Sequence, residues 1–135
     1  MDEQPVEGTI ELVVPADTRL VRLARLVASG IGSAAGFDVE EIEDLRIAVD
    51  EGCSALIEAG IDSPILLSFE VDGDGVVVLG STEASTDASQ DPERMSLSDQ
   101  ILRVVTDEHE LGASHGRARF RFSKRSRAAS ARNGG

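Results

Sequence analysis

Residues 37–60, FDVEEIEDLRIAVDEGCSALIEAG, decide the fold, because they form the longest uninterrupted helical pattern in the chain. Asp38 followed by Glu41 has the form of an N-terminal capping box, and Gly60 is a residue that commonly ends a helix. The apolar residues recur at helical spacing and make one continuous stripe, formed by Ile42, Leu45, Val49, Cys53 and Leu56. The stretch therefore predicts a long helix with one face against a core.

The composition is that of one globular domain. The chain has 135 residues and a formal net charge of −12, and its single cysteine excludes an intrachain disulfide. Cys53 lies on the apolar stripe, where we expect a small buried hydrophobe, with redox sensing as the alternative. No apolar run approaches the roughly 20 residues that span a bilayer, and no signal peptide opens the chain. We therefore expect a cytoplasmic protein with no membrane partner.

Charge is divided unevenly along the chain. Residues 123–135, SKRSRAASARNGG, carry four basic residues and no acid, which leaves a formal charge of −16 on residues 1–122. A body this acidic repels nucleic acid and suits a basic protein partner, although solubility alone would also account for it. The tail has no aromatic residue to stack on bases, so we interpret it as a disordered basic tail and expect no direct nucleic-acid partner.

Apolar periodicity predicts the remaining elements. Residues 1–8 are expected to be a flexible N-terminus, and one domain is expected to cover residues 9–122. We expect strands over residues 9–14, 64–71, 76–79, 108–111 and 117–122, and helices over residues 17–35, 38–60 and 96–106. The sequence DGDG at residues 72–75 predicts a hairpin turn, and residues 81–95 a long loop. An α+β two-layer sandwich, with helices on one face of a mostly antiparallel mixed sheet, satisfies this order.

The outer helices also have apolar stripes that predict their buried sides. In the helix over residues 17–35 the stripe is Leu20, Leu23, Ala24, Val27 and Ile31, with Arg19 and Arg22 on the opposite face. In the helix over residues 96–106, which Ser96 and Asp99 would cap, the stripe is Leu97, Ile101, Val104 and Val105.

Residues 44–60, DLRIAVDEGCSALIEAG, resemble the first conserved box of the bacterial anti-sigma factors that are also serine protein kinases. These proteins belong to the histidine-kinase-like GHKL ATPase superfamily. The resemblance covers roughly residues 9–122 and includes the order of the elements. It implies the histidine-kinase-like ATPase fold and a homodimer.

The resemblance also implies a nucleotide site beside the central helix. In the family, a glutamate of this box acts as the general base or orients it, and an asparagine four residues later holds the Mg²⁺ that bridges ATP phosphates. Glu51 matches the glutamate, whereas Ala55 stands at the asparagine position. A methyl group cannot ligate a hard cation, which needs oxygen donors. We therefore predict that Glu51 is a vestigial catalytic residue and that no metal is held here.

Two further boxes of the family are altered. Glu83 takes the place of the aspartate that reads adenine, without the glycines that follow it in the family. Ser96 and Ser98 stand where the family has glycines that let backbone N–H groups approach phosphates. The resemblance thus predicts a degenerate pocket at Glu51, Ala55, Glu83, Ser96 and Ser98. No cofactor is required, and ATP or ADP with Mg²⁺ would bind only if the pocket is competent.

The function implied by the resemblance is that of an anti-sigma regulatory protein. It would sequester an alternative sigma factor of RNA polymerase and be released by an anti-sigma antagonist of the STAS type. Arg22, with Arg19 beside it, matches a helix position that contacts both partners in the family; a merely exposed arginine is the alternative. Two other functions stay open: an active serine protein kinase that phosphorylates its antagonist, and a structural module that binds no sigma factor.

Overall fold

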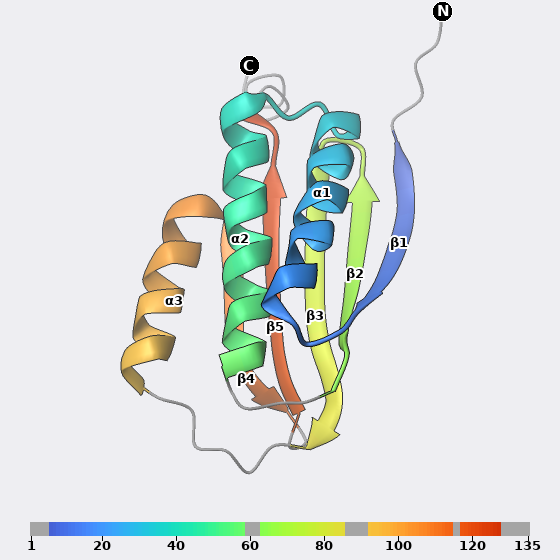
Figure 1. Cartoon of the computed structure of the whole chain (residues 1–135). Coiled ribbons are helices and arrows are strands. Elements are labelled where there is room, and N and C mark those ends of the chain that lie inside the picture. The colour runs from blue at the N-terminus through green and yellow to red at the C-terminus, as the bar shows by residue number, and fades with distance from the viewer. Residues whose placement is uncertain (1–5, 59–62, 86–91, 115–116, 128–135) are drawn as a thin grey trace, which may run out of the picture.

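The computed structural model describes residues 6–58, 63–85, 92–114 and 117–127, which fold into two layers (Figure 1). One layer is a sheet, and the helices cover one of its faces. The strands are β1 (Glu7–Val14), β2 (Ile65–Asp72), β3 (Gly75–Ser85), β4 (Glu108–Ser114) and β5 (Arg117–Arg125), and the helices are α1 (Thr18–Ala34), α2 (Val39–Glu58) and α3 (Pro92–Val105). The predicted α+β two-layer architecture is confirmed. None of the helices in these ranges is long and apolar enough to cross a bilayer.

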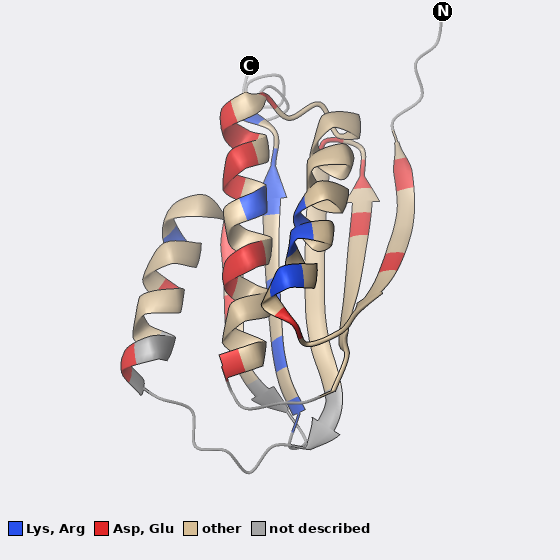
Figure 2. Cartoon of the chain, in the orientation of Figure 1, with Lys and Arg blue, Asp and Glu red and all other residues tan. Residues whose placement is uncertain are grey.

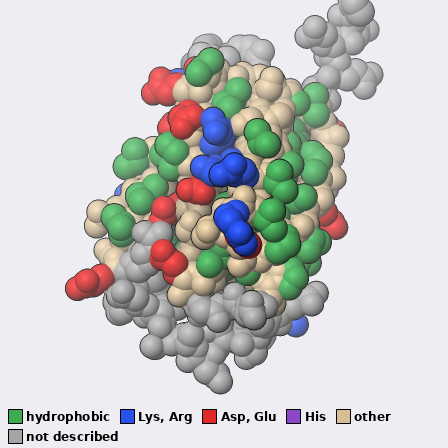
Figure 3. Space-filling view, in the orientation of Figure 1, with side chains coloured by type: hydrophobic (Ala, Val, Ile, Leu, Met, Phe, Trp, Pro, Cys, Tyr) green, Lys and Arg blue, Asp and Glu red, His purple; other side chains and the backbone are tan. Residues whose placement is uncertain are grey.

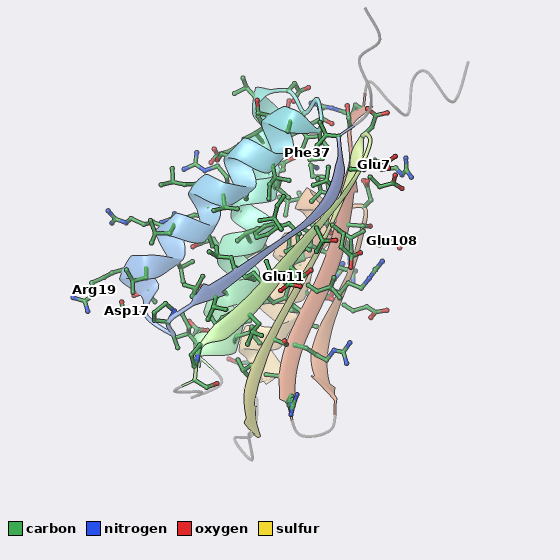
Figure 4. The ribbon with its side chains drawn as sticks, turned by 90° about the vertical axis from the view of Figure 1, so that its right-hand side faces the viewer. Glu7, Glu11, Asp17, Arg19, Phe37 and Glu108 are labelled. Carbon is green, nitrogen blue, oxygen red and sulfur yellow. The ribbon has the colours of Figure 1, made fainter. Side chains whose placement is uncertain are left out.

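The strands lie in the order β1-β2-β3-β5-β4. Every pairing between them is antiparallel, so within the described ranges the sheet is antiparallel throughout and not mixed. Val78 lies opposite Phe69 on one side and Phe122 on the other, and opposite residues of antiparallel strands share a face. These three side chains are fully buried beneath the helices. Their strand neighbours point to the second face, which no described helix covers, and we call it the open face (Figure 4).

The close approach of α2 to the sheet depends on two glycines. The ring of Phe120 on β5, 2 % exposed, lies against both Gly52 on α2 and Gly80 on β3. A β-carbon added at Gly52 would come within 2.8 Å of this ring, and one added at Gly80 would overlap it. The packing of Phe120 therefore requires glycine at both positions.

The buried side of α2 follows its predicted stripe, because Leu45, Val49 and Cys53 are fully buried and Leu56 is nearly so. Burial raises the pKa of the Cys53 thiol to about 12, which keeps the thiol protonated and unreactive.

The buried sides of the outer helices differ from the prediction. On α1 the core contains Val21 and Ala28, and the predicted Leu23 is half exposed. On α3 the core contains Leu102 with Val105, whereas Leu97 and Val104 are exposed, at 47 % and 82 %. Both helices carry leucine or valine on more than one side, so the apolar pattern alone did not fix their rotation about the helix axis.

The expected loop over residues 81–95 is shorter than predicted. Strand β3 continues to Ser85, because Ser81 pairs with Arg119 and Ser85 with Arg117 across an irregularity in the register. Helix α3 already begins at Pro92, and proline is favoured in the first turn of a helix. The prediction that Ser96 and Asp99 cap this helix is therefore wrong.

The last strand also extends past the end predicted for the domain. β5 runs to Arg125, and the buried Lys124 ammonium donates to the Val105 carbonyl oxygen at 3.0 Å, at the end of α3. The Arg127 amide donates to the nearly buried Glu41 carboxylate at 2.6 Å, in the first turn of α2. Residues 123–127 are therefore part of the folded domain, contrary to the predicted tail, while residues 128–135 lie outside the described ranges.

Candidate functional site

Glu51 and Ser98, which are 47 positions apart, meet between α2 and α3. The Ser98 hydroxyl donates a hydrogen bond of 2.7 Å to a Glu51 carboxylate oxygen. Ser98 is fully buried and Glu51 is partly buried, so this bond lies largely out of contact with water. Two of the residues predicted for the pocket are thus brought together, and the Glu51 carboxylate is already bound by the protein itself.

The antiparallel packing of α2 and α3 positions this pair. Seven residues before Glu51, the Asp44 carboxylate lies 3.6 Å from the Lys124 ammonium, and seven residues after Ser98, the Val105 carbonyl accepts from the same ammonium. The two helices therefore run past each other in register over about two turns, as Figure 1 shows.

The residues present do not fit a magnesium ion. Ala55 lies one turn beyond Glu51 on α2 and is half-buried, and its methyl group offers no oxygen. Glu51 brings one carboxylate to this space, and one of its oxygens accepts from Ser98. Among the described residues, no three histidine, cysteine, aspartate or glutamate side chains gather as a metal-binding group.

Ser96 and Ser98 do not lie at a helix N-terminus, where the helix predicted over residues 96–106 would have placed them. Because α3 begins at Pro92, both residues lie beyond the first turn, where backbone N–H groups bond to carbonyls of their own helix. Ser96 is exposed and Ser98 is buried, so they point to different sides. Glu83 falls near the end of β3, and its side chain lies outside the described part of the chain.

Asp99, the next residue of α3, binds in another direction. Its carboxylate lies 2.6 Å from the Nε2 of His109 on β4 and 2.7 Å from the Arg103 guanidinium one turn along α3. The hydrogen bond with His109, followed by the charges of His109 and Arg103, lowers the pKa of the Asp99 carboxyl. Sequence reasoning missed this pair, since residues ten apart in a helix and the following strand give no local pattern.

Arg19 and Arg22 have different surroundings on α1. The Arg19 guanidinium binds both oxygens of Asp17, at 3.1 and 2.8 Å, and the Arg19 amide donates to the same carboxylate, which caps α1. These bonds lower the pKa of Asp17 to about 2 and raise that of Arg19. Arg22 is exposed and makes no hydrogen bond or ion pair with another residue in the described ranges. It is therefore the arginine that is free to meet a partner.

The exposed face of α1 combines positive charge with apolar surface. Arg19, Arg22, Leu23 and Leu26 recur at helical spacing, and the two leucines are 50 % and 63 % exposed. We call these four residues the α1 surface. The helix contains arginines and no acid, in contrast to the acidic residues along α2 (Figure 2). Figure 3 shows basic side chains beside hydrophobic ones on this face of the molecule.

The chain is similar to known proteins along most of its length. Residues 14–121 match the family model described as the histidine kinase-like ATPase domain. The serine-protein kinase RsbW of Halalkalibacterium halodurans is 41% identical over 54 residues, which are 40% of this chain and 33% of that protein. RsbW of Bacillus subtilis is 45% identical over 49 residues, 36% of this chain and 31% of that protein. The matched part thus spans about a third of these relatives' length.

A solved structure has the same fold. The crystal structure of the RsbU and RsbW domains of Rv1364c from Mycobacterium tuberculosis superposes with a TM-score of 0.67 at 14% sequence identity, over 87% of this chain and 32% of that one. Together with the family match over residues 14–121, this likeness leads to one conclusion: the chain belongs to the histidine kinase-like ATPase domain family.

Proposed function

We propose that this protein is a cytoplasmic anti-sigma regulatory protein that binds an alternative sigma factor without needing a nucleotide. An anti-sigma antagonist of the STAS type would release the sigma factor by competing for the same helix. The observation that carries the proposal is the α1 surface, an exposed basic and apolar helix face on a domain similar to RsbW. The site beside α2, which lacks an oxygen ligand at Ala55, supports binding without catalysis.

The α1 surface fits a partner helix with acidic and apolar residues. Leu23 and Leu26 supply apolar area that is buried on contact, and Arg22 can pair with a carboxylate in a planar two-bonded geometry. The local charge is opposite to the net charge of −12, so the expectation that an acidic body selects a basic partner does not describe this helix. Complementary charge at such a surface affects the rate of association and the choice of partner.

Direct binding measurements test the proposal. The protein is titrated against purified sigma factors of its own organism, with and without Mg-ATP, in an interferometry assay. We expect one sigma factor to bind with the same affinity in both conditions and Arg22→Ala to weaken it about tenfold or more, the scale of losing a charged hydrogen bond.

The matched control for this experiment is Arg103→Ala, which removes another exposed arginine from α3. We expect it to leave the affinity unchanged. A complex that disappears without Mg-ATP would contradict the nucleotide-independent part of the proposal. Equal losses in the two arginine variants would contradict the role of the α1 surface.

We also propose that the protein forms a homodimer through the open face. Apolar side chains lie on it along β1, β2 and β3: Val13 and Leu66 are 62 % and 37 % exposed, and Leu79 on the central strand is partly exposed. Hollows of about 400 and 230 Å³ lie along it, the first lined by Glu70, Asp72 and Arg125 among others and the second by Val13 and Leu66 among others. Surface of this kind is suited to burial between two molecules.

The charges on the inner strands of the open face are arranged to complement a second copy. Strand β5 carries Arg119, Arg121 and Arg125, and β2 carries Glu70 and Asp72 across the central strand. Both edge strands are acidic on this face, with Glu108 and Glu110 on β4 and Glu7 and Glu11 on β1. A half-turn about an axis parallel to β3 would lay β5 of one molecule over β2 of the other, as a two-fold interface requires. Arginines of β5 would then face carboxylates of β2 on either side of Leu79 of the central strands, while the acidic edge strands β4 and β1 would overlie each other.

The second candidate function is that of a serine protein kinase acting on the antagonist. It is favoured by the retention of Glu51 and by the similarity to proteins named serine-protein kinases. Incubation with radiolabelled ATP and the antagonist tests it. Phosphate incorporated by the wild-type protein and lost in Glu51→Gln would establish the kinase; no incorporation in either protein would leave the binding function as the better account.

A further inference from the structure

We propose that the Ser98 hydroxyl is an internal ligand of Glu51, which closes α3 onto α2 in the absence of any nucleotide. The inference rests on the proposed nucleotide-independent function and extends it, because it states what holds the site together when no ligand does. The contact that carries it is the 2.7 Å hydrogen bond between a fully buried hydroxyl and a carboxylate oxygen.

The bond belongs to the stronger class of hydrogen bonds. Its acceptor is a carboxylate, and bonds to ionised groups are shorter and roughly twice as strong as those between neutral groups. Ser98 is 0 % exposed, so a hydroxyl that lost this acceptor could not turn to bulk water for another. Opening α3 away from α2 therefore breaks this bond, and the loss is only partly offset by the water that then reaches both groups.

Neighbouring contacts hold α3 in the same position. Asp99 reaches β4 through the 2.6 Å contact with His109, in a different direction from Ser98. At the far end of the helix, the Lys124 ammonium bonds to the Val105 carbonyl. The Ser98–Glu51 bond is the member of this set that joins α3 directly to α2. The hydroxyl of a serine can donate this bond, which an alanine at the same position could not.

The same contact restricts the site. While the Ser98 hydroxyl donates to one oxygen of the Glu51 carboxylate, that oxygen is less available to a water, a substrate hydroxyl or a metal ion. A nucleotide that needed the space between α2 and α3 would have to displace a side chain of the protein itself. The protein's own side chains thus hold α3 against α2, and no bound ligand is needed to keep α3 in this position.

Hydrogen–deuterium exchange of the isolated protein tests the inference. In Ser98→Ala we expect the amides of α3 to exchange about tenfold faster or more, the scale set by a hydrogen bond to a charged group. The control is Thr106→Val, which removes a hydroxyl just after α3 that bonds to the Leu102 carbonyl of α3 and not to α2. Unchanged α3 exchange in Ser98→Ala, or equal increases in both variants, would overturn the inference.

Variants of Glu51 give a second test in which Ser98 is intact. Glu51→Gln keeps an oxygen acceptor and should retain most of the protection of α3, whereas Glu51→Ala should lose it. The double variant Glu51→Ala with Ser98→Ala should exchange no faster than Glu51→Ala alone, because the Ser98–Glu51 bond is already absent from that single variant. Additive effects, or equal exchange in the Gln and Ala variants, would contradict a direct bond.

The two proposals fail in distinguishable ways. Exchange is measured on the protein alone, with and without Mg-ATP. A slowing of α3 exchange in the wild type by Mg-ATP would contradict the nucleotide-independent function. An unchanged Ser98→Ala profile would contradict only the role of Ser98, whatever the partner experiments show.

Discussion

At the scale of single residues, the separation of the helix layer from the sheet is set by two glycines, which have no β-carbon. Phe120 fills the space above Gly52 and Gly80, so the ring replaces the volume that a β-carbon would need. From the sequence, Gly52 reads as a weak point in a helix, because glycine lowers helix stability. The cost is offset by burial of an aromatic ring, which only the tertiary structure reveals.

Gly80→Ala should destabilise the protein by about 1–3 kcal/mol, because the added methyl group overlaps the Phe120 ring in a fully packed core. Chemical denaturation would measure the change. Gly30→Ala is the matched control: its β-carbon meets nothing within 4 Å, so it should stabilise α1 by about 0.5–1 kcal/mol. The same sign in both variants would contradict the packing described for Phe120.

Also at this scale, the meeting of Glu51 and Ser98 could be predicted only in part. The sequence and the family resemblance placed both residues in one pocket, and the structure brings them within hydrogen-bonding distance. The sequence did not predict that Ser98 would donate to Glu51, because Ser98 was expected in the first turn of a helix that started at residue 96. The difference came from the start of α3, which lies at Pro92 and not at Ser96.

At the scale of elements, helix and strand identity was predictable and helix rotation was not. Strands β2 and β5 bury every second residue, as expected for strands with one face against a core. Helix α3 has apolar residues around most of its circumference, and the core uses Leu102, which was not in the predicted stripe. The side of α3 that is buried depends on the shape of the surfaces that α2 and the sheet present to it. The sequence of α3 alone does not contain that information.

Two leucines of α3 can test which side of this helix faces the core. Leu102→Ala should cost about 2–5 kcal/mol, because the side chain is fully buried and its removal leaves a cavity. Leu97→Ala, on the same helix but 47 % exposed, should change stability by less than about 0.5 kcal/mol. Thermal or denaturant unfolding measures both, and a larger loss in Leu97→Ala would mean that α3 is turned the other way.

The start of α1 should respond to acid. The pKa of Asp17 is lowered from 3.8 to about 2, chiefly by its hydrogen bonds with Arg19, so its contribution to stability is fully present above pH 3.8. As the pH falls toward 2 the carboxylate is protonated and that contribution is lost. Asp17→Asn keeps an oxygen for the cap but removes the charge, so its stability should fall less steeply between pH 4 and pH 2.

Urea unfolding at a series of pH values measures that slope. An unchanged slope in Asp17→Asn would show that other carboxylates account for the acid sensitivity, and Asp38 and Asp99, whose pKa values are also lowered, are the next to test.

At the scale of the whole molecule, the two faces have different chemistry. The helix layer presents the α1 surface, and the open face combines apolar side chains on β1, β2 and β3 with arginines on β5 and carboxylates on β1, β2 and β4. The two-layer order was predictable from the succession of strands and helices. The open face was not, because strand order and register decide which residues share it, and neither can be read from one strand at a time.

The division between the faces can be tested with two charge-introducing variants. Leu79→Lys places an ammonium at the centre of the open face and should convert the homodimer to monomer in sedimentation, with sigma-factor binding measured separately. Arg22→Glu reverses a charge of the α1 surface and should leave the dimer intact while weakening the sigma complex. A wild-type protein that sediments as a monomer would contradict the proposed dimer.

The contacts of Lys124 and Arg127 have a practical consequence for handling this protein. The Lys124 side chain binds the end of α3, and the Arg127 amide binds the first turn of α2. The chain must therefore reach residue 127 for both helix ends to keep their partners. A truncation at Phe122, where the alternation of apolar residues in the sequence stops, would remove the Arg127 amide that donates to the Glu41 carboxylate. Affinity tags and fluorescent reporters should therefore be joined after residue 127, and fragments cut shorter will report the behaviour of a damaged fold.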